Sequence, residues 1–270
     1  KEKSMKKILI TGAAGFLGQL SIDYFKNKYK LYLIDKLPLK QKNFVKVDIT
    51  NYEQVDKIFN KIKPDFILHY ASEIFDTYKK SQININNIDG TLNLVKAAKK
   101  YKTKKFIFTS TFSIFEKNYE DLIDEIEPIS CSNYYGLSKA ETERILLSTE
   151  KKFNVTIFRC PVIVEKSRAH RLGILFEFLK DNASLWVLGD GNNKIQFLSA
   201  IDLFKMTEKS FSLKGKHIFN IGTEKVLTFK ETFNFLIKKT NSKCKVKHFN
   251  KFFGLLILKI LSSLRLINFI

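Results

Sequence analysis

A tyrosine and a lysine four residues apart are the first residues whose types and spacing could do chemistry. The segment 135–139 reads YGLSK, and on a helix Tyr135 and Lys139 would lie one turn apart on the same face. The pKa of an unperturbed tyrosine, about 10, is too high for a base at neutral pH, and a neighbouring ammonium would lower it. Such a tyrosine could exchange a proton with a substrate hydroxyl. The pair alone is also common on solvated helix faces, so its meaning depends on its surroundings.

A glycine-rich turn lies upstream of this pair. The segment 11–18 reads TGAAGFLG, and it follows an apolar run and opens a stretch of helical periodicity, the context in which such turns bind dinucleotides. Gly12 would permit the tight turn, Gly15 would let the backbone approach a pyrophosphate, and Gly18 would let the helix pack close to the strand. The Tyr135–Lys139 pair therefore stands downstream of a predicted dinucleotide site.

The cofactor predicted at this turn is NAD. The N–H groups near Phe16 and Leu17, at a helix N-terminus, would attract the phosphates. Asp35 ends the next apolar run, where a carboxylate accepts hydrogen bonds from the ribose hydroxyls of NAD and repels the additional phosphate of NADP. Lys36 is also predicted to lie in the cofactor site. Its positive charge would not repel the additional phosphate of NADP, and so it weakens the preference for NAD. On balance the carboxylate favours NAD.

Strands and helices alternate along the part of the chain that would position these groups. Apolar runs predict strands at 7–11, 31–35, 44–48, 66–70, 105–109 and 155–159, and periodicity predicts helices at 15–26, 52–61, 89–101 and 135–151. This alternation indicates βαβ units, and so an α/β fold with a Rossmann-type, doubly wound parallel sheet. The runs are apolar throughout, as expected of strands covered on both faces.

A smaller second domain is predicted from the looser pattern after position 159. Its expected elements are a helix at 169–180, strands at 186–188 and 219–222, and a helix at 228–239. We therefore expect an NAD-binding domain over 5–160 and 196–223, and a substrate-binding lid over 161–195 and 224–270.

Composition excludes several classes of protein. With 44% hydrophobic residues in 270, the chain is not disordered. The net charge of +20 comes mainly from lysines spread along the whole chain, and no nucleic-acid recognition motif accompanies them. The three cysteines are widely spaced, which predicts neither a disulfide framework nor a metal site. A reducing cytoplasm is the expected compartment.

Taken together, these segments resemble the extended short-chain dehydrogenases/reductases, especially the nucleotide-sugar epimerases and dehydratases of the NAD-dependent epimerase/dehydratase family. The resemblance covers residues 6 to about 222. Besides the segments above, it rests on VDI at 47–49, HYAS at 69–72, NIDGT at 87–91, TSTFSIF at 109–115, GDGNNKIQF at 189–197, Asp202 and FNIG at 219–222.

The resemblance implies a role for each matching residue. Additional cofactor contacts are implied at Asp48, Ile49, Tyr70, Ala71, Ser72, Asn87 and Pro161. Thr111 matches the catalytic serine or threonine, Tyr135 the acid/base and Lys139 its partner, and the last two also contact the cofactor. Lys194, Arg168 and Arg171 are the candidates for binding the substrate's diphosphate. For His69, Asn87 and Asp202 a structural role is an equal alternative, because buried polar groups need partners in any case.

One departure from the family bears on the reaction. The 4,6-dehydratases carry an Asp-Glu pair directly after the catalytic threonine, whereas this chain has Phe112-Ser113. The resemblance therefore favours a nucleotide-sugar epimerase of the 4-epimerase type, in which hydride passes transiently to NAD. The alternatives are a dehydrogenase, reductase or dehydratase of a nucleotide sugar or another hydroxy or keto substrate, and a non-catalytic NAD-binding protein.

Two further expectations concern partners. The helices after Asp89 and Tyr135 carry long apolar faces, and the family commonly pairs two such helices, so we expect a homodimer. The segment 252–270, FFGLLILKILSSLRLINFI, contains Lys259 and Arg265 and so is not expected to span a membrane. A lid helix is favoured there over contact with a membrane surface. Family members are usually longer, which leaves this chain either truncated or diverged at its end.

Overall fold

The computed structural model of the protein describes residues 5–73, 85–115, 123–165, 176–250, 252–254 and 256. The chain divides into two units, the first made of residues 1–163 and 198–222 and the second of residues 164–197 and 223–270. The domain boundaries expected from the sequence lie one to three residues from these. The role of the second unit as a substrate lid stays a prediction.

A seven-stranded parallel sheet forms the centre of the first unit. Its strands are β1 (Lys7–Thr11), β2 (Lys30–Asp35), β3 (Phe44–Lys46), β4 (Phe66–His69), β5 (Lys105–Thr111), β6 (Val155–Cys160) and β11 (Lys216–Asn220). The strand order β11-β6-β5-β4-β1-β2-β3 confirms the predicted doubly wound α/β fold. The order reverses between β1 and β4, and ligands of such sheets bind beyond the carboxyl ends of the strands at that point.

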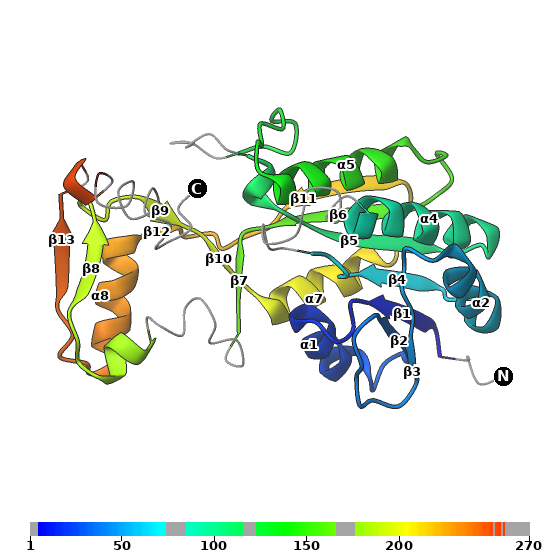
Figure 1. The fold of residues 1–270 in the computed structure, drawn as a ribbon, viewed down its shortest axis with the longest axis horizontal. Coiled ribbons are helices and arrows are strands. Elements are labelled where there is room, and N and C mark those ends of the chain that lie inside the picture. The colour runs from blue at the N-terminus through cyan, green and yellow to red at the C-terminus, as the bar shows by residue number, and fades with distance from the viewer. Residues whose placement is uncertain are drawn as a thin grey trace. The chain divides into compact units, whose positions relative to one another are not determined.

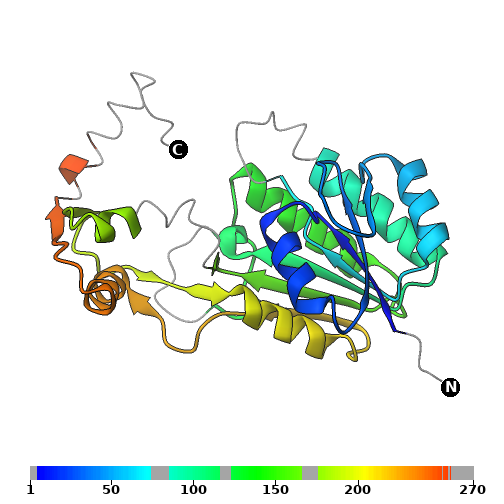
Figure 2. The same cartoon turned by 90° about the horizontal axis from the view of Figure 1, so that it is seen from below.

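Helices cover both faces of this sheet (Figures 1 and 2). On one face lie α2 (Tyr52–Ile62), α4 (Gly90–Lys100) and α5 (Tyr134–Ser148), and on the other lie α1 (Phe16–Phe25) and α7 (Ala200–Ser210). In α2 the buried residues are Val55, Ile58, Phe59 and Ile62, the spacing of a single apolar stripe. The side chain of Asn51 caps its N-terminus by accepting a hydrogen bond from the Gln54 N–H.

The second unit contains shorter elements. In it, β8 (Leu185–Leu188) pairs with β13 (Val246–Phe249), and β9 (Lys194–Ile195) pairs with β12 (Leu227–Thr228). The helix α8 (Phe229–Thr240) begins with a capping box between Thr228 and Glu231. A separate pair, β7 (Val162–Val164) with β10 (Phe197–Ser199), lies where the chain passes from one unit to the other.

Several predicted elements differ from those observed. The strand predicted at 219–222 is wrong in position, because β11 ends at Asn220 and pairs with β6 from Lys216 onward. The helix predicted at 135–151 ends at Ser148, where Thr149 adopts an extended conformation. A π-helical turn, Ile85–Asp89, precedes α4. The helix α7 and the strands β7, β9, β10, β12 and β13 were not predicted.

Two predicted segments lie largely outside the described residues. Of the helix expected at 169–180, only residues 176–180 are described, and they are helical. Of the segment 252–270, residues 252–254 and 256 are described. Among the helices that the structure describes, none has the length and apolar character needed to cross a membrane.

A buried ion pair fixes α5 to the sheet. The guanidinium of Arg159, on β6, donates from Nη2 to Glu143 Oε2 on α5 over 2.8 Å, and its Nη1 donates to the carbonyl oxygen of Glu125 over 3.0 Å. The two side chains are only 4% and 1% exposed. Removing one partner of such a pair leaves a buried charge uncompensated, and this is far costlier than losing a surface pair.

We therefore expect Arg159→Met to lower the free energy of unfolding by about 3–5 kcal/mol. The control is Arg144→Met, on α5 next to Glu143. Arg144 pairs with Glu141, but its side chain is 70% exposed, and a pair of this kind contributes about 0.3–0.5 kcal/mol. Urea unfolding of both variants measures the difference. Equal losses in the two variants would contradict a structural role for the buried pair.

Candidate active site

The glycine-rich turn follows β1 and leads into α1. Gly12 has φ +69°, and a Cβ atom added there would lie 2.5 Å from the backbone nitrogen of Ala71. A Cβ on Gly18 would lie 2.2 Å from the carbonyl oxygen of Gly12, so Gly18 lets α1 pack against the turn itself, where the sequence analysis expected the strand. Gly15 is exposed at the N-cap of α1. Phe16 and Leu17 form the first turn of that helix.

The carboxylate of Asp35 ties the end of β2 to the glycine turn. One of its oxygens accepts a hydrogen bond from the Ala14 N–H over 3.0 Å, and the other accepts one from the Leu37 N–H over 2.9 Å. A carboxylate can accept about four hydrogen bonds, so Asp35 keeps capacity for ribose hydroxyls. The adjacent Lys36 forms an ion pair with Glu73.

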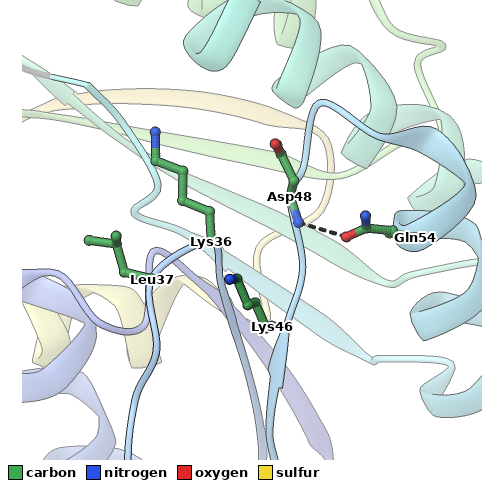
Figure 3. A pocket seen from close by; sticks show the side chains of 5 residues that line it. All are labelled: Lys36, Leu37, Lys46, Asp48 and Gln54. Carbon is green, nitrogen blue, oxygen red and sulfur yellow. Dashed lines mark hydrogen bonds between the residues drawn. The ribbon is translucent and has the colours of Figure 1, made fainter.

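A hollow of about 520 Å³ lies beyond the carboxyl ends of β2 and β3. Figure 3 shows the five residues that line it: Lys36, Leu37, Lys46, Asp48 and Gln54. Of these, Lys36 and Asp48 were predicted as cofactor residues, whereas Leu37, Lys46 and Gln54 were missed because no motif marks them. The side chain of Ile49, also predicted near the adenine, packs against Gly90 in the core.

The residues after β4 face the glycine turn mainly through their backbone. The Ala71 N–H donates to the hydroxyl of Thr11 over 3.4 Å. The Tyr70 hydroxyl is buried, its ring lies near Phe204 on α7, and burial raises the pKa of this phenol. Tyr70 therefore points into the layer between sheet and helix. The Ser72 hydroxyl donates to the Glu73 carbonyl over 3.4 Å.

His69 is structural in this protein. Its Nδ1 lies 2.7 Å from the Thr11 hydroxyl and its Nε2 lies 2.9 Å from the Thr91 hydroxyl. Because Thr91 donates its own proton to the Asn87 carbonyl over 2.6 Å, Nε2 must donate to Thr91 and Nδ1 must accept from Thr11. Burial lowers the pKa of His69 to about 3, with a smaller contribution from the charge of Lys139, so the ring is neutral.

Asn87 connects the loop after β4 to the catalytic helix. Its side-chain oxygen accepts from the Glu73 N–H over 2.8 Å, and its amide nitrogen donates to the Glu73 carbonyl over 3.1 Å. The same nitrogen donates to the Ser138 hydroxyl over 2.9 Å. Asn87 is 3% exposed, so this network is shielded from water. Asn87 thus holds both the loop after β4 and α5, and its predicted cofactor contact stays a prediction.

The three predicted catalytic residues lie on β5 and on α5, which packs beside it. Thr111 is the last residue of β5, and its hydroxyl accepts from the Ser113 N–H and donates to the Ser113 hydroxyl over 3.1 and 3.2 Å. Tyr135 is half-buried in the first turn of α5. The ammonium of Lys139 lies 5.7 Å from the centre of the Tyr135 ring and donates to the Thr109 carbonyl over 2.9 Å.

Lys139 is the electrostatically unusual group of the site. It is buried, and desolvation lowers its pKa to about 8, partly offset by Cys160 and Glu143. An ammonium with so little water around it interacts strongly with a nearby negative charge. This ammonium lies close to the Tyr135 ring, and its stabilisation of a phenolate there stays a prediction.

Gly136 brings α5 against β5, and sequence reasoning missed it. A Cβ at this position would lie 2.4 Å from the Ser113 carbonyl oxygen. The cap residue Asn133 also reaches this region, accepting from the Gly136 N–H over 2.7 Å and donating to the Ser113 carbonyl over 3.4 Å. The available signal was the glycine in YGLSK, a poor helix residue inside a predicted helix.

The remaining predicted residues follow α5 in the chain. Pro161 lies between β6 and β7 and is half-buried, and Asp202 is in the first turn of α7, paired with Lys205 over 3.1 Å. Lys194 is exposed on β9 in the second unit. Arg168 and Arg171 lie outside the described residues. The second unit also holds a hollow of about 470 Å³, lined by Leu185, Trp186, Val187, Leu188, Gly189, Asp190, Asn193, Phe229 and Phe233.

The described residues of the first unit fit a bound NAD. The turn at Gly12 and Gly15 is free of side chains, an N-terminal helix end follows it, and Asp35 stands at the next strand end. This is the arrangement that accepts a pyrophosphate and an adenosine ribose. Within the described ranges, no three His, Cys, Asp or Glu residues gather in a group that could hold a metal ion.

Comparison with known proteins agrees with this site. A model of the NAD dependent epimerase/dehydratase family matches residues 8–222, and the chain belongs to that family. The prediction of an NAD-dependent enzyme of the epimerase/dehydratase type is thereby confirmed.

Individual relatives include both kinds of activity. The chain is 30% identical over 261 residues to a dTDP-D-glucose 4,6-dehydratase of Dictyostelium discoideum, with 82% of this chain and 59% of that protein covered. It is 29% identical to a putative UDP-glucose 4-epimerase of Methanocaldococcus jannaschii, covering 85% and 81% of the two chains. The crystal structure of the Thermotoga maritima UDP-glucose 4-epimerase with UDP-glucose has a TM-score of 0.79 at 23% identity, covering 90% and 85%.

We expect Gly12→Ala to abolish NAD binding and to destabilise the first unit. The new methyl group would collide with the backbone of Tyr70 and Ala71, in addition to the cost of about 1–2 kcal/mol of a left-handed alanine. Gly215→Ala is the control, because Gly215 also has positive φ, +84°, but has nothing within 4 Å. Calorimetric titration with NAD and thermal unfolding would be compared. NAD affinity retained in Gly12→Ala would rule out this turn as the cofactor cradle.

Proposed function

We propose that this protein is a nucleotide-sugar epimerase of the 4-epimerase type. The observation that carries the proposal is that Tyr135 and the buried Lys139 lie together on α5 beside β5, which ends at Thr111, with Phe112 and Ser113 in the 3-10 turn just beyond it. Those two positions hold the acid pair in the 4,6-dehydratases that the sequence resembles. Phenylalanine and serine cannot supply carboxylate acid–base catalysis for the loss of water.

The residues of the site support a simple exchange of one proton. Tyr135, as phenolate, takes the proton from a sugar hydroxyl, and the Thr111 hydroxyl hydrogen-bonds to the same oxygen. The buried Lys139 ammonium keeps the phenolate charged. NAD, held at the glycine turn and Asp35, would supply the reversible hydride acceptor for the sugar carbon. After the keto-sugar has turned over in the pocket, Tyr135 gives the proton back to the sugar oxygen, so that Tyr135 serves as base and then as acid.

The nucleotide part of the substrate is proposed to bind the second unit. The hollow beside β8 is lined by the aromatic rings of Trp186, Phe229 and Phe233. It also contains the polar Asp190 and Asn193. This composition suits the base of a nucleotide, which is a flat ring with polar edges. Lys194, together with Arg168 and Arg171, is proposed to hold the diphosphate, since charged donors make the stronger hydrogen bonds to phosphate.

Product analysis tests the reaction. With catalytic amounts of NAD and a panel of UDP-, dTDP- and GDP-sugars, we expect an epimerised sugar and no accumulation of NADH. Stoichiometric NADH with an oxidised sugar would establish a dehydrogenase instead. A 4-keto-6-deoxy product would establish a dehydratase and show that the acid pair is not needed.

Tyr135→Phe should lower kcat by about 10²–10⁴-fold or more, with NAD affinity retained. The matched control is Tyr134→Phe, which removes a hydroxyl from the preceding residue of α5, whose side chain is exposed. Turnover and NAD titration would be measured for both. Equal activity of the two variants would remove Tyr135 from the acid/base role.

A homodimer formed through α4 and α5 is also proposed. The long apolar faces expected of these helices are largely used within the chain, where Leu94, Val95 and Leu146 are buried against the sheet. Exposed apolar residues on their outer faces are Leu92 and Leu137. Two such patches brought together by a two-fold axis would bury this surface.

We expect a dimer mass by light scattering at micromolar concentration, and a monomer for Leu92→Glu, because the carboxylate would be buried without a partner. Ile201→Glu places the same charge on α7, at a residue of similar exposure, and should leave the dimer intact. A monomeric unmodified protein would refute the assembly.

The compartment we propose is the reducing cytoplasm. Cys160 and Cys244 are free, buried thiols in the structure. Free buried thiols without disulfides are typical of proteins from reducing compartments.

A further inference from the structure

An ion pair bridges two loops on opposite sides of the glycine turn. Lys36 directly follows the last residue of β2, and Glu73 lies four residues beyond the end of β4. The Lys36 ammonium contacts Glu73 Oε1. In the sheet, β1 stands between β2 and β4, so these strands are about 10 Å apart, two strand spacings. The pair therefore crosses the carboxyl end of β1, where the turn that would hold NAD begins.

The two residues are held very differently. The backbone N–H and carbonyl of Glu73 are both bonded to the side chain of Asn87, and the Asn86 amide approaches the Glu73 carboxylate at 3.4 Å. The Glu73 side chain is 15% exposed, whereas that of Lys36 is 45% exposed. Glu73 is thus anchored through its backbone, and Lys36 is the more exposed member of the pair.

The position of the pair has a consequence for the cofactor. A ligand whose pyrophosphate lies on the turn between Gly12 and Gly18 has its adenosine at Asp35 and its nicotinamide toward β5. The Lys36–Glu73 pair joins the strand ends on either side of that turn. A dinucleotide held there would therefore lie beneath the pair, and its exchange would require the two charges to separate.

We propose that Lys36 and Glu73 form a clasp across the cofactor crevice that limits the exchange of NAD. The inference rests on the proposed function, because an epimerase returns its hydride to the same cofactor and works best when that cofactor stays bound. Lys36 and Glu73 are positioning residues, since they act on the access of the cofactor and not on the reacting atoms.

The clasp makes a kinetic prediction that a plain contact to NAD does not. Breaking it opens the crevice in both directions, so the association and dissociation rate constants of NAD should both rise. In Glu73→Gln, which leaves the predicted cofactor residue Lys36 in place, the dissociation constant should change little. A partly exposed ion pair of this kind corresponds to about a two- to five-fold change in a rate. Because the pair is accessible to salt, raising the ionic strength should speed dissociation from the unmodified protein.

Stopped-flow fluorescence with the etheno derivative of NAD measures both rate constants. The variants are Lys36→Met, Glu73→Gln and their combination, and each is expected to show the two- to five-fold increase. The double variant should be no faster than either single one, because both break the same interaction. Salt should no longer accelerate dissociation in any of the three.

Lys100→Met is the matched control, because it removes one lysine and one ion pair of similar exposure, Lys100–Asp56, that joins α4 to α2 away from the crevice. Its exchange rates should equal those of the unmodified protein. Unchanged rates in Lys36→Met and Glu73→Gln, or increases that add in the double variant, would overturn the clasp. A rise in dissociation alone, with weaker affinity, would identify Lys36 as a direct NAD contact instead. Failure of the unmodified protein to bind the dinucleotide would refute the proposed function itself.

Discussion

A buried chain of hydrogen bonds holds the glycine turn and the Tyr–Lys helix in fixed positions relative to each other. It begins at the Thr11 hydroxyl at the end of β1, passes through the ring of His69 to Thr91, and continues through Asn87 to Ser138 on α5. Each member is buried and has its partners, so a displacement of one strand or helix would leave a polar group unsatisfied in a dry interior. The glycine turn and the Tyr–Lys helix are therefore positioned by the same network.

This network explains why the catalytic groups can be placed on short, simple elements. Ser138 lies between Tyr135 and Lys139, one turn of helix inside the capped N-terminus. The ion pair of Arg159 with Glu143 holds the next turn, and the contact of Gly136 with Ser113 holds the first. With three attachments in about ten residues, α5 has little freedom to slide, and Lys139 stays desolvated beneath the ring of Tyr135.

Predictions from sequence succeeded where a pattern is local. The six strands expected before position 160 are all present, with ends shifted by at most two residues, because a run of apolar residues between turns has few alternatives in a sheet covered on both faces. The predicted secondary structure was less accurate after Arg159. There the strands are two to five residues long and pair across large separations in sequence, and short strands leave no periodicity to read. The helix α7 was missed although its buried residues Ala200, Leu203, Phe204 and Thr207 have the spacing of a helix face.

The sequence by itself determined the chemistry available to this protein: a glycine turn after a strand, an acidic residue at the next strand end, and a tyrosine and a lysine one helical turn apart. These depend on residue type and on spacing within a single element, and both are visible in a linear chain. Only the tertiary structure decided which other groups act with them. Glu73 faces Lys36 because β1 lies between their strands, Lys46 and Gln54 share a hollow with Asp48 because β3 is the edge strand beside β2, and His69 is neutral because burial lowers its pKa. Contacts of this kind arise from the order of strands in the sheet, and no spacing along the chain encodes them.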